Sequence, residues 1–139
     1  MSFLLDTCVV SELIKPQPNP GVRGWVDEHD ESLLHLSVVT LGELHKEIAK
    51  LPPGERRERL LQWVGHDLLL RFEGRLLAVD LAVAVRWGWL LGEAERSGRP
   101  LPVVDALIAA AALVHRCAVV TRDAGHLVRT GVEVVNPWR

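Results

Sequence analysis

Short apolar runs alternate along the chain with longer segments in which apolar residues recur at helical spacing. Near-continuous apolar runs of this length are typical of buried strands, and they occur at residues 3–5, 33–37, 76–79, 118–121 and 132–135. Because these runs do not alternate between apolar and polar residues, they favour a parallel sheet with both faces covered. We therefore predict an α/β protein with a central parallel sheet of about 4–5 short strands flanked by helices.

The longer segments are predicted to be helices. In one of them Leu41, Leu44, Ile48 and Leu51 lie three or four residues apart, which puts them on one helix face. The same reasoning predicts helices over residues 8–14, 20–30, 41–51, 55–72, 81–98 and about 103–116. The breaks between them that contain proline and glycine are too short to be domain linkers, so residues 1–139 are expected to form a single domain.

The last predicted helix carries a single charged residue within an apolar run. In LPVVDALIAAAALV, residues 101–114, Asp105 lies in the first turn and no cationic residue accompanies it. A carboxylate in apolar surroundings is costly unless another group pairs with it or coordinates it. Asp105 therefore indicates either a partner from another element or a bound cation.

Other acidic residues follow the predicted strands. Asp6 and Asp80 come directly after a strand, Asp123 comes one residue after another, and Glu43 lies in the first turn of the helix predicted at 41–51. These positions suit helix capping, and Glu43 forms an S/T-x-x-E capping box with Thr40. They also suit a metal site, because ligands of open α/β sheets bind beyond the carboxyl ends of the strands. Converging carboxylates would repel one another, and a hard cation such as Mg²⁺ would relieve that repulsion.

Four segments of the chain resemble PIN-domain proteins, and most closely the VapC/FitB-like toxins of bacterial toxin–antitoxin pairs. The segments are LLDTCVVSELIKPQPN, SVVTLGEL, GRPLPVVDALIAAAALVH and AVVTRDAGHL…VEVVNPWR, in this order and spacing. The resemblance extends from Leu4 to Trp138 and implies a three-layer PIN-like fold with an acidic pocket. It implies cleavage of RNA phosphodiester bonds that depends on Mg²⁺ or Mn²⁺. It also implies a homodimer and a cognate antitoxin, with DNA contacted only indirectly through the antitoxin.

The resemblance assigns the acidic residues of the family to four positions here. They are Asp6 in LLDT, Glu43 in TLGEL, Asp105 before the alanine-rich segment, and Asp123 after the fourth strand. Asp6 and Asp105 are expected to be the direct metal ligands. Glu43 and Asp123 would bind a second ion, hold metal-bound waters or orient the attacking water.

The residues around these acids partly follow the family pattern. Thr7 and Thr121 match the small hydroxyl residues that commonly line the pocket, and Arg122 either contacts a substrate phosphate or forms a surface or structural ion pair. Two positions depart from the pattern. Cys8 replaces a common asparagine, and His126 stands where many relatives carry a second acid. A thiol cannot reproduce the paired donor and acceptor of an amide, so the local hydrogen bonding is expected to differ.

Composition excludes several classes of protein. A hydrophobic content of 48% with 24% charged residues excludes wholesale disorder, and a net charge of −2 argues against a broad electrostatic coat of nucleic acid. The longest apolar run, residues 106–114, is far shorter than a membrane helix of about 20 residues. The start MSFLLD lacks the features of a signal peptide, so a cytoplasmic location is expected. The two cysteines are expected to be free thiols.

The tryptophans are interpreted as core and interface residues rather than as base-stacking residues, since the chain holds five of them with no tyrosine and two phenylalanines. Trp87 and Trp89 are two residues apart and cannot share one helix face. At least one of them is therefore a candidate for a subunit or partner contact.

Two functions remain open at this stage, and a third is disfavoured. The first is a metal-dependent endoribonuclease toxin that an antitoxin inhibits. The second is a catalytically weak PIN-like binding module that acts through an antitoxin complex on operator DNA. A phosphoryl-transfer enzyme of the haloacid-dehalogenase kind would need D-x-D after the first strand, where this chain reads DTC.

Overall fold

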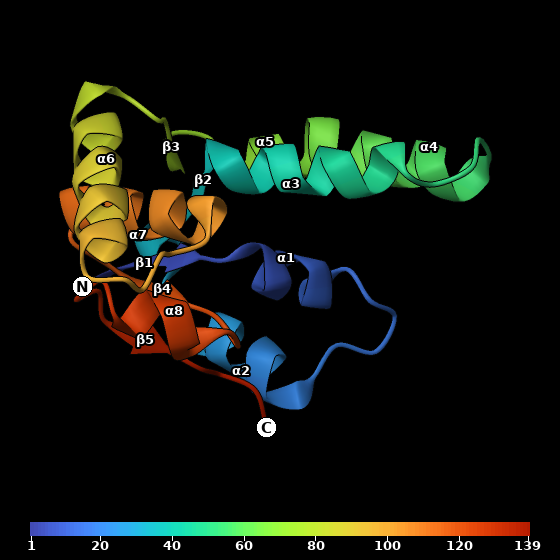
Figure 1. Cartoon of the computed structure of the whole chain (residues 1–139). Coiled ribbons are helices and arrows are strands. Elements are labelled where there is room, and N and C mark those ends of the chain that lie inside the picture. The colour runs from blue at the N-terminus through green and yellow to red at the C-terminus, as the bar shows by residue number, and fades with distance from the viewer.

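A computed structural model describes all of residues 1–139 and contains a five-stranded sheet in the order β3-β2-β1-β4-β5 (Figure 1). The strands are β1 (Ser2–Leu5), β2 (Leu34–Ser37), β3 (Leu76–Leu77), β4 (Cys117–Val120) and β5 (Val134–Val135). Every neighbouring pair is parallel, as the near-continuous apolar runs predict. The outer strands β3 and β5 have two residues each and are shorter than predicted.

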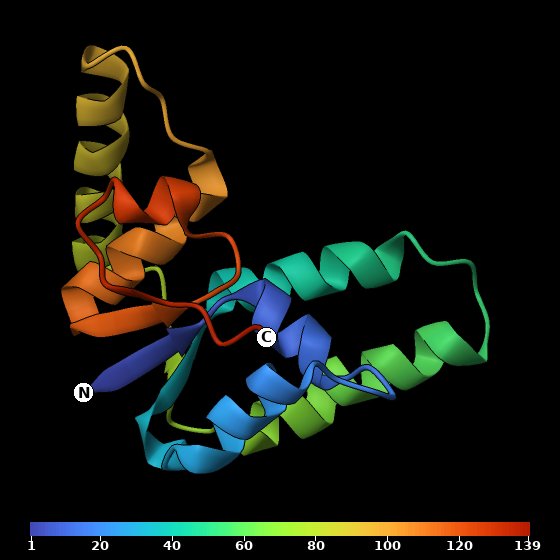
Figure 2. The same cartoon turned by 90° about the horizontal axis from the view of Figure 1, so that it is seen from below.

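Helices connect the strands and cover both faces of the sheet. They are α1 (Thr7–Leu13), α2 (Pro20–Glu28), α3 (Val38–Ala49), α4 (Glu55–Gln62), α5 (Leu68–Arg71), α6 (Leu81–Arg96), α7 (Val103–His115) and α8 (Ala124–Val128). A 3₁₀ turn, Glu31–Leu33, precedes β2, and a π-helical segment, Trp63–Asp67, interrupts the helix predicted over 55–72. In both views α3 to α5 extend away from the sheet on the side opposite α6 (Figures 1 and 2).

The start of α3 differs from the prediction. The helix begins at Val38, and Ser37 caps it by accepting a hydrogen bond from the backbone N–H of Val39 at 3.1 Å. The predicted capping box of Thr40 and Glu43 is therefore wrong, because a helix that already has a cap places both residues inside it. Thr40 and Glu43 instead lie three residues apart on one helix face.

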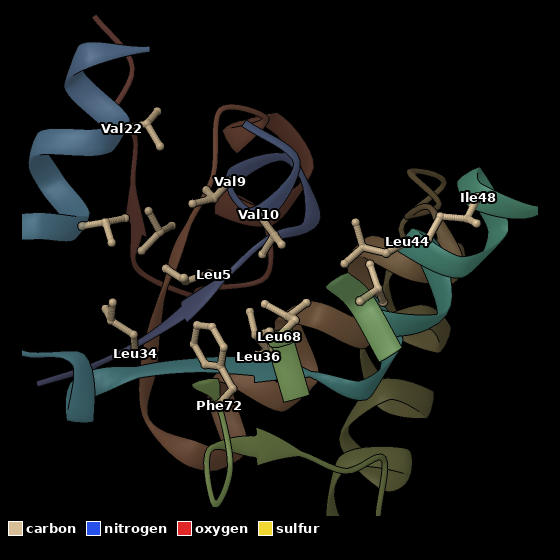
Figure 3. Packing of buried hydrophobic residues seen from close by; sticks show 13 residues of the cluster. Leu5, Val9, Val10, Val22, Leu34, Leu36, Leu44, Ile48, Leu68 and Phe72 are labelled. Carbon is tan, nitrogen blue, oxygen red and sulfur yellow. The ribbon is translucent and has the colours of Figure 1, made fainter. Parts of the chain in front are cut away.

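One hydrophobic core lies between the sheet and helices α1 to α5. Figure 3 shows Leu5, Leu34 and Leu36 of the strands packed among side chains of these helices, with Phe72 beside them. Leu36 is completely buried and Leu5 almost so. The helices on this side are held by this apolar packing, since burial of apolar area is the main favourable contribution to folding.

A second core lies on the opposite face, against α6, α7 and α8. Leu4 and Val119 point to this side, whereas their neighbours Leu5 and Val120 point to the first core, because successive strand residues face opposite sides of a sheet. The four consecutive alanines of α7, residues 109–112, are buried here. Their small side chains let the α7 backbone lie close to the sheet.

Trp87 and Trp89 of α6 have different surroundings, as their spacing predicts. Trp87 packs against the second core and its indole N–H donates to the carbonyl oxygen of Val103 at 3.3 Å. Trp89 is 67% exposed, and Leu81 and Val85 of the same helix are also exposed. Both cysteines are free thiols, as predicted. None of the helices combines the length and the apolar character that a bilayer-spanning helix requires.

Glu12 of α1 is the one charged residue whose side chain is buried. One carboxylate oxygen accepts from Lys15 Nζ at 3.0 Å, and the other accepts from the backbone N–H of Asn19 at 2.9 Å. The hydrogen bond from Lys15, followed by that from Asn19, lowers the pKa of the Glu12 carboxyl below its ordinary value. The ionised form of Glu12 therefore stabilises the connection between α1 and α2 through these two hydrogen bonds.

Replacement of Glu12 by glutamine is expected to destabilise the protein at neutral pH. A lowered pKa in the folded state means that ionised Glu12 stabilises the fold above the ordinary pKa of 4.5, and that this contribution disappears as the pH falls through the folded-state pKa. Urea unfolding of Glu12→Gln and the wild type should therefore differ at neutral pH and converge in acid, below the folded-state pKa of Glu12. Glu47→Gln removes an exposed ion pair with Lys50 at the same spacing and should have little effect at either pH. A difference that does not change with pH would contradict the prediction.

Candidate active site at the carboxyl ends of the strands

The sheet order places two chain segments side by side at its centre. The chain leaves β1 for β2 on one side, while β4 lies on the other side, so the topology reverses between β1 and β4. Leu5 is paired with Val120, and the backbone N–H of Asp6 donates to the carbonyl oxygen of Val120 at 3.0 Å. Asp6 and Thr121 therefore leave the sheet together at its switch point, where open α/β sheets bind ligands.

The Asp6 carboxylate is held by two hydrogen bonds. Oδ1 accepts from the backbone N–H of Thr7 at 2.9 Å, and Oδ2 accepts from the hydroxyl of Thr121 at 2.8 Å. The Thr121 hydroxyl in turn accepts from the backbone N–H of Asp123 at 3.0 Å, and Thr121 is completely buried. Asp6 also occupies the N-cap position of α1, so the capping interpretation is confirmed for this residue. Capping and a fixed carboxylate at the strand ends occur together here.

Glu43 is connected to this group through Thr7. The hydroxyl of Thr7 donates to Glu43 Oε1 at 2.5 Å, and the hydroxyl of Thr40 lies 3.3 Å away from that of Thr7. Thr7 thus contacts Asp6 with its backbone N–H and Glu43 with its side chain. Thr40, expected from the sequence to cap α3, instead joins this group, and its position three residues before Glu43 on one helix face was the signal for that.

Asp105 lies in the first turn of α7, as predicted, and its carboxylate has no ion pair or hydrogen bond with another protein group. Burial, followed by the negative charges of Asp6 and Asp123, raises the pKa of the Asp105 carboxyl, while His126 acts in the opposite direction. The structure thus brings three of the predicted acids close enough for their charges to interact. No cationic side chain pairs with Asp105.

Asp123 and Asp80 have different roles. Asp123 stands at the N-cap position of α8 but makes no capping hydrogen bond with its side chain, so the capping interpretation is wrong for this residue. Its exposed carboxylate remains available. Asp80 caps α6 by accepting from the backbone N–H of Val83 at 3.0 Å. Asp80, the acid after β3, therefore acts as a helix cap and not as part of the acidic site.

Cys8 belongs to the hydrogen-bond network of the site. Its Sγ lies 3.4 Å from the Thr121 hydroxyl and 3.9 Å from Asp6 Oδ2. Burial raises the pKa of the Cys8 thiol, and the nearby carboxylates of Asp6 and Asp123 add to this effect. The thiol is therefore protonated at neutral pH and acts as a weak donor toward Thr121 or Asp6.

The donor set is one of oxygen atoms and suits a hard divalent cation. No three acidic, histidine or cysteine side chains come close enough to hold a metal ion by themselves. Mg²⁺ usually keeps several waters and takes only one or two protein carboxylates, so a pair such as Asp6 and Asp105 fits it. Zn²⁺ and Cu⁺ prefer imidazole or thiolate ligands, and the protonated Cys8 thiol does not supply one.

Arg122 lies between Thr121 and Asp123 at the edge of this site. It forms no ion pair, so the structural ion pair considered from the sequence is absent. Its guanidinium carbon instead lies 4.8 Å from the ring centroid of Trp138. This contact could not be predicted from the sequence, because no local pattern relates a strand end to the C-terminal tail.

Sequence comparison places the chain among known proteins over almost its whole length. A model of the PIN domain matches residues 3–132. The chain is 37% identical over 136 residues to plasmid stability protein StbB of Pseudomonas syringae pv. tomato, and the match covers 98% of both chains. It is 35% identical to VapC ribonuclease Y4jK of Sinorhizobium fredii, with 98% of this chain and 97% of that protein covered.

Comparison with solved structures gives the same result. The FitAcB crystal structure from Neisseria gonorrhoeae contains a chain that superposes with a TM-score of 0.91 at 36% identity, covering 99% of both chains. The parallel sheet flanked by helices that the apolar runs predict is therefore confirmed, and so is the PIN-like arrangement that the resemblance implies.

Proposed function

The chain belongs to the PIN-domain family, and we propose that it is a metal-dependent endoribonuclease that acts as the toxin of a toxin–antitoxin pair. The observation that carries this proposal is the grouping of Asp6, Asp105 and Asp123 beyond β1 and β4, with Glu43 attached through Thr7. An unpaired, partly buried carboxylate next to two others is unfavourable for the fold itself. A binding role for a cation explains why it is present.

In the proposed mechanism Asp6 and Asp105 would hold the ion, and Glu43 and Asp123 would bind a second ion, hold metal-bound waters or orient the attacking water. A bound Mg²⁺ or Mn²⁺ would supply Lewis acidity at the phosphate and a lowered pKa of bound water. Asp6 is held in one orientation by Thr7 and Thr121, so little reorganisation is needed when the substrate binds. Glu43 or Asp123 would accept the proton of the attacking water as a general base.

RNA cleavage by the purified protein tests this proposal. We expect cleavage in Mg²⁺ or Mn²⁺ and loss of cleavage in EDTA, since the reaction depends on the ion. Cleavage that continues in EDTA would contradict metal dependence. No cleavage of any RNA by correctly folded protein with bound metal would favour the alternative function, a catalytically weak module acting through an antitoxin complex on operator DNA. The replacements at Cys8 and His126 are the observations that favour this alternative.

Metal binding should also be visible without any substrate. A ligand that binds only the folded state stabilises it, by about 1.4 kcal/mol at ten times its dissociation constant. We expect Mg²⁺ to raise the melting temperature of the wild type and of Glu47→Gln, whose carboxylate lies outside the site and pairs with Lys50. The rise should be much smaller in Asp105→Asn. An equal rise in Asp105→Asn would contradict the assignment of Asp105 as a ligand.

The proposed partner is a cognate antitoxin, and contact with DNA would occur only through it. The structural relatives support this proposal, because one of them is a FitAB complex bound to a DNA fragment, with a chain that superposes at a TM-score of 0.90 and 35% identity. Co-expression with the protein encoded by the adjacent reading frame should yield a complex that no longer cleaves RNA. A stable mixture of the two proteins with undiminished cleavage would contradict the pairing. The expected homodimer is checked by measuring the mass of the purified protein in solution.

A further inference from the structure

Arg122 lies in the chain between Thr121 and Asp123 of the acidic site, and its side chain forms no ion pair. Its guanidinium lies over the indole of Trp138, at 4.8 Å from the ring centroid. The guanidinium donates no hydrogen bond to another protein group, so its N–H groups stay free for another acceptor. The charge of Arg122 helps to lower the pKa of Glu12. Glu12 is not an ion-pair partner of Arg122, because its carboxylate is already hydrogen bonded to Lys15 and Asn19.

The indole is fixed because the chain on both sides of Trp138 is fixed. Before it, β5 pairs with β4, and the backbone N–H of Thr121 donates to the carbonyl oxygen of Val135 at 2.9 Å. After it, the side chain of Asn19 accepts from the backbone N–H of Arg139 at 3.2 Å and donates to its carbonyl oxygen at 2.7 Å. The ring itself packs against the first core.

Gly21 at the start of α2 allows the tail to lie in this position. A Cβ atom at Gly21 would lie 2.3 Å from the carbonyl oxygen of Pro137, which is a backbone atom and cannot rotate away. The C-terminal tail runs past α2 in the structure (Figure 1). Only glycine therefore permits this close approach, which places the indole beneath Arg122.

We propose that Arg122 binds a phosphate of the RNA beside the carboxylate site, and that Trp138 is a positioning residue that holds its guanidinium there. The fork of N–H groups of arginine matches phosphate oxygens, and a preoriented fork loses less side-chain freedom on binding. The C-terminal tail is thereby part of the substrate-binding surface. This inference rests on the proposed ribonuclease function, because the phosphate belongs to that substrate.

The test compares KM and kcat of the wild type with those of Arg122→Met, Trp138→Leu and Trp138→Phe, on one RNA substrate below the unfolding temperature. We expect KM to rise about 3- to 10-fold in Arg122→Met and Trp138→Leu with little change in kcat, because binding and not chemistry is lost. Trp138→Phe should stay near the wild type, since it keeps an aromatic face for the guanidinium. Trp89→Leu, which removes an exposed tryptophan of α6, should not change KM.

Two further measurements separate positioning from a structural role. Arg122→Met should lower the salt dependence of binding, with a slope of log KM against log salt that falls by about 0.7 for a single-stranded RNA. Trp138→Leu should add nothing to KM in the Arg122→Met background, because two residues that act as one unit are not additive. If Trp138→Leu does not fold, Arg122→Lys is measured in its place, because position 122 is exposed. Lysine lacks the planar guanidinium that rests on the indole, so Arg122→Lys should also raise KM.

The outcomes distinguish this inference from the proposed function. A wild type that does not cleave RNA overturns the proposed function. A wild type that cleaves, with an unchanged KM in Arg122→Met or Arg122→Lys, overturns the role of Arg122. An equal rise in KM on Trp138→Leu with and without Arg122 overturns the positioning role of Trp138.

Discussion

Asp105→Asn is expected to lower RNA cleavage by about a hundredfold or more while leaving the metal-free protein at least as stable as the wild type. The loss of activity follows from the assignment of Asp105 as a metal ligand, because an amide oxygen carries no charge to hold the cation. The gain or retention of stability follows from the surroundings. Burial and the charges of Asp6 and Asp123 raise the pKa of the Asp105 carboxyl, so its ionised form disfavours the folded state.

The difference in stability between Asp105→Asn and the wild type should depend on pH. For an acid whose pKa is raised on folding, the ionised form destabilises the fold fully above the folded-state pKa, and the effect disappears below the ordinary value of 3.8. In urea unfolding without metal, Asp105→Asn should therefore have the larger free energy of unfolding at neutral pH. The free energies of unfolding of the two proteins should converge in acid. Glu47→Gln, an exposed acid outside the site, should keep full cleavage. Full cleavage by Asp105→Asn, or its marked destabilisation at neutral pH, would contradict the assignment.

Leu4→Ala is expected to produce the largest loss of stability, about 2–5 kcal/mol. Leu4 is completely buried in β1, the central strand of the sheet, and belongs to the second core. Its removal leaves a cavity that the surrounding α7 backbone and strands fill only in part. Because a domain of this size is stable by about 5–15 kcal/mol, the change is a large fraction of the total.

Leu81→Ala is the matched control for Leu4→Ala, because Leu81 is the same residue type at 81% exposure. Its stability should stay within about 0.5 kcal/mol of the wild type. The free energies of unfolding of all three proteins come from urea titration with a common slope. A loss below about 1 kcal/mol in Leu4→Ala would show that the second core depends little on this side chain.

Local patterns predicted the elements and their type well. The apolar runs predicted the five strands, because strands buried on both faces are apolar along their length. The helical spacing predicted the helices around them except α8 (Ala124–Val128), which is too short to show it. The ends of elements were less well predicted. The α3 helix begins at Val38 because Ser37 caps it, whereas the match of Thr40 and Glu43 to a capping box pointed to a later start.

The sequence by itself determined the kinds of residue at the strand ends and, through their motifs, the resemblance to PIN-domain proteins. Only the tertiary structure decided which of them meet. Asp6 and Thr121 are neighbours because β1 pairs with β4, and Asp80 is used as a helix cap after β3. Thr7 reaches Glu43, and Trp138 reaches Arg122, across elements that are distant in the chain. Such contacts depend on how strands and helices pack against one another, and the residue pattern within one element does not predict that packing.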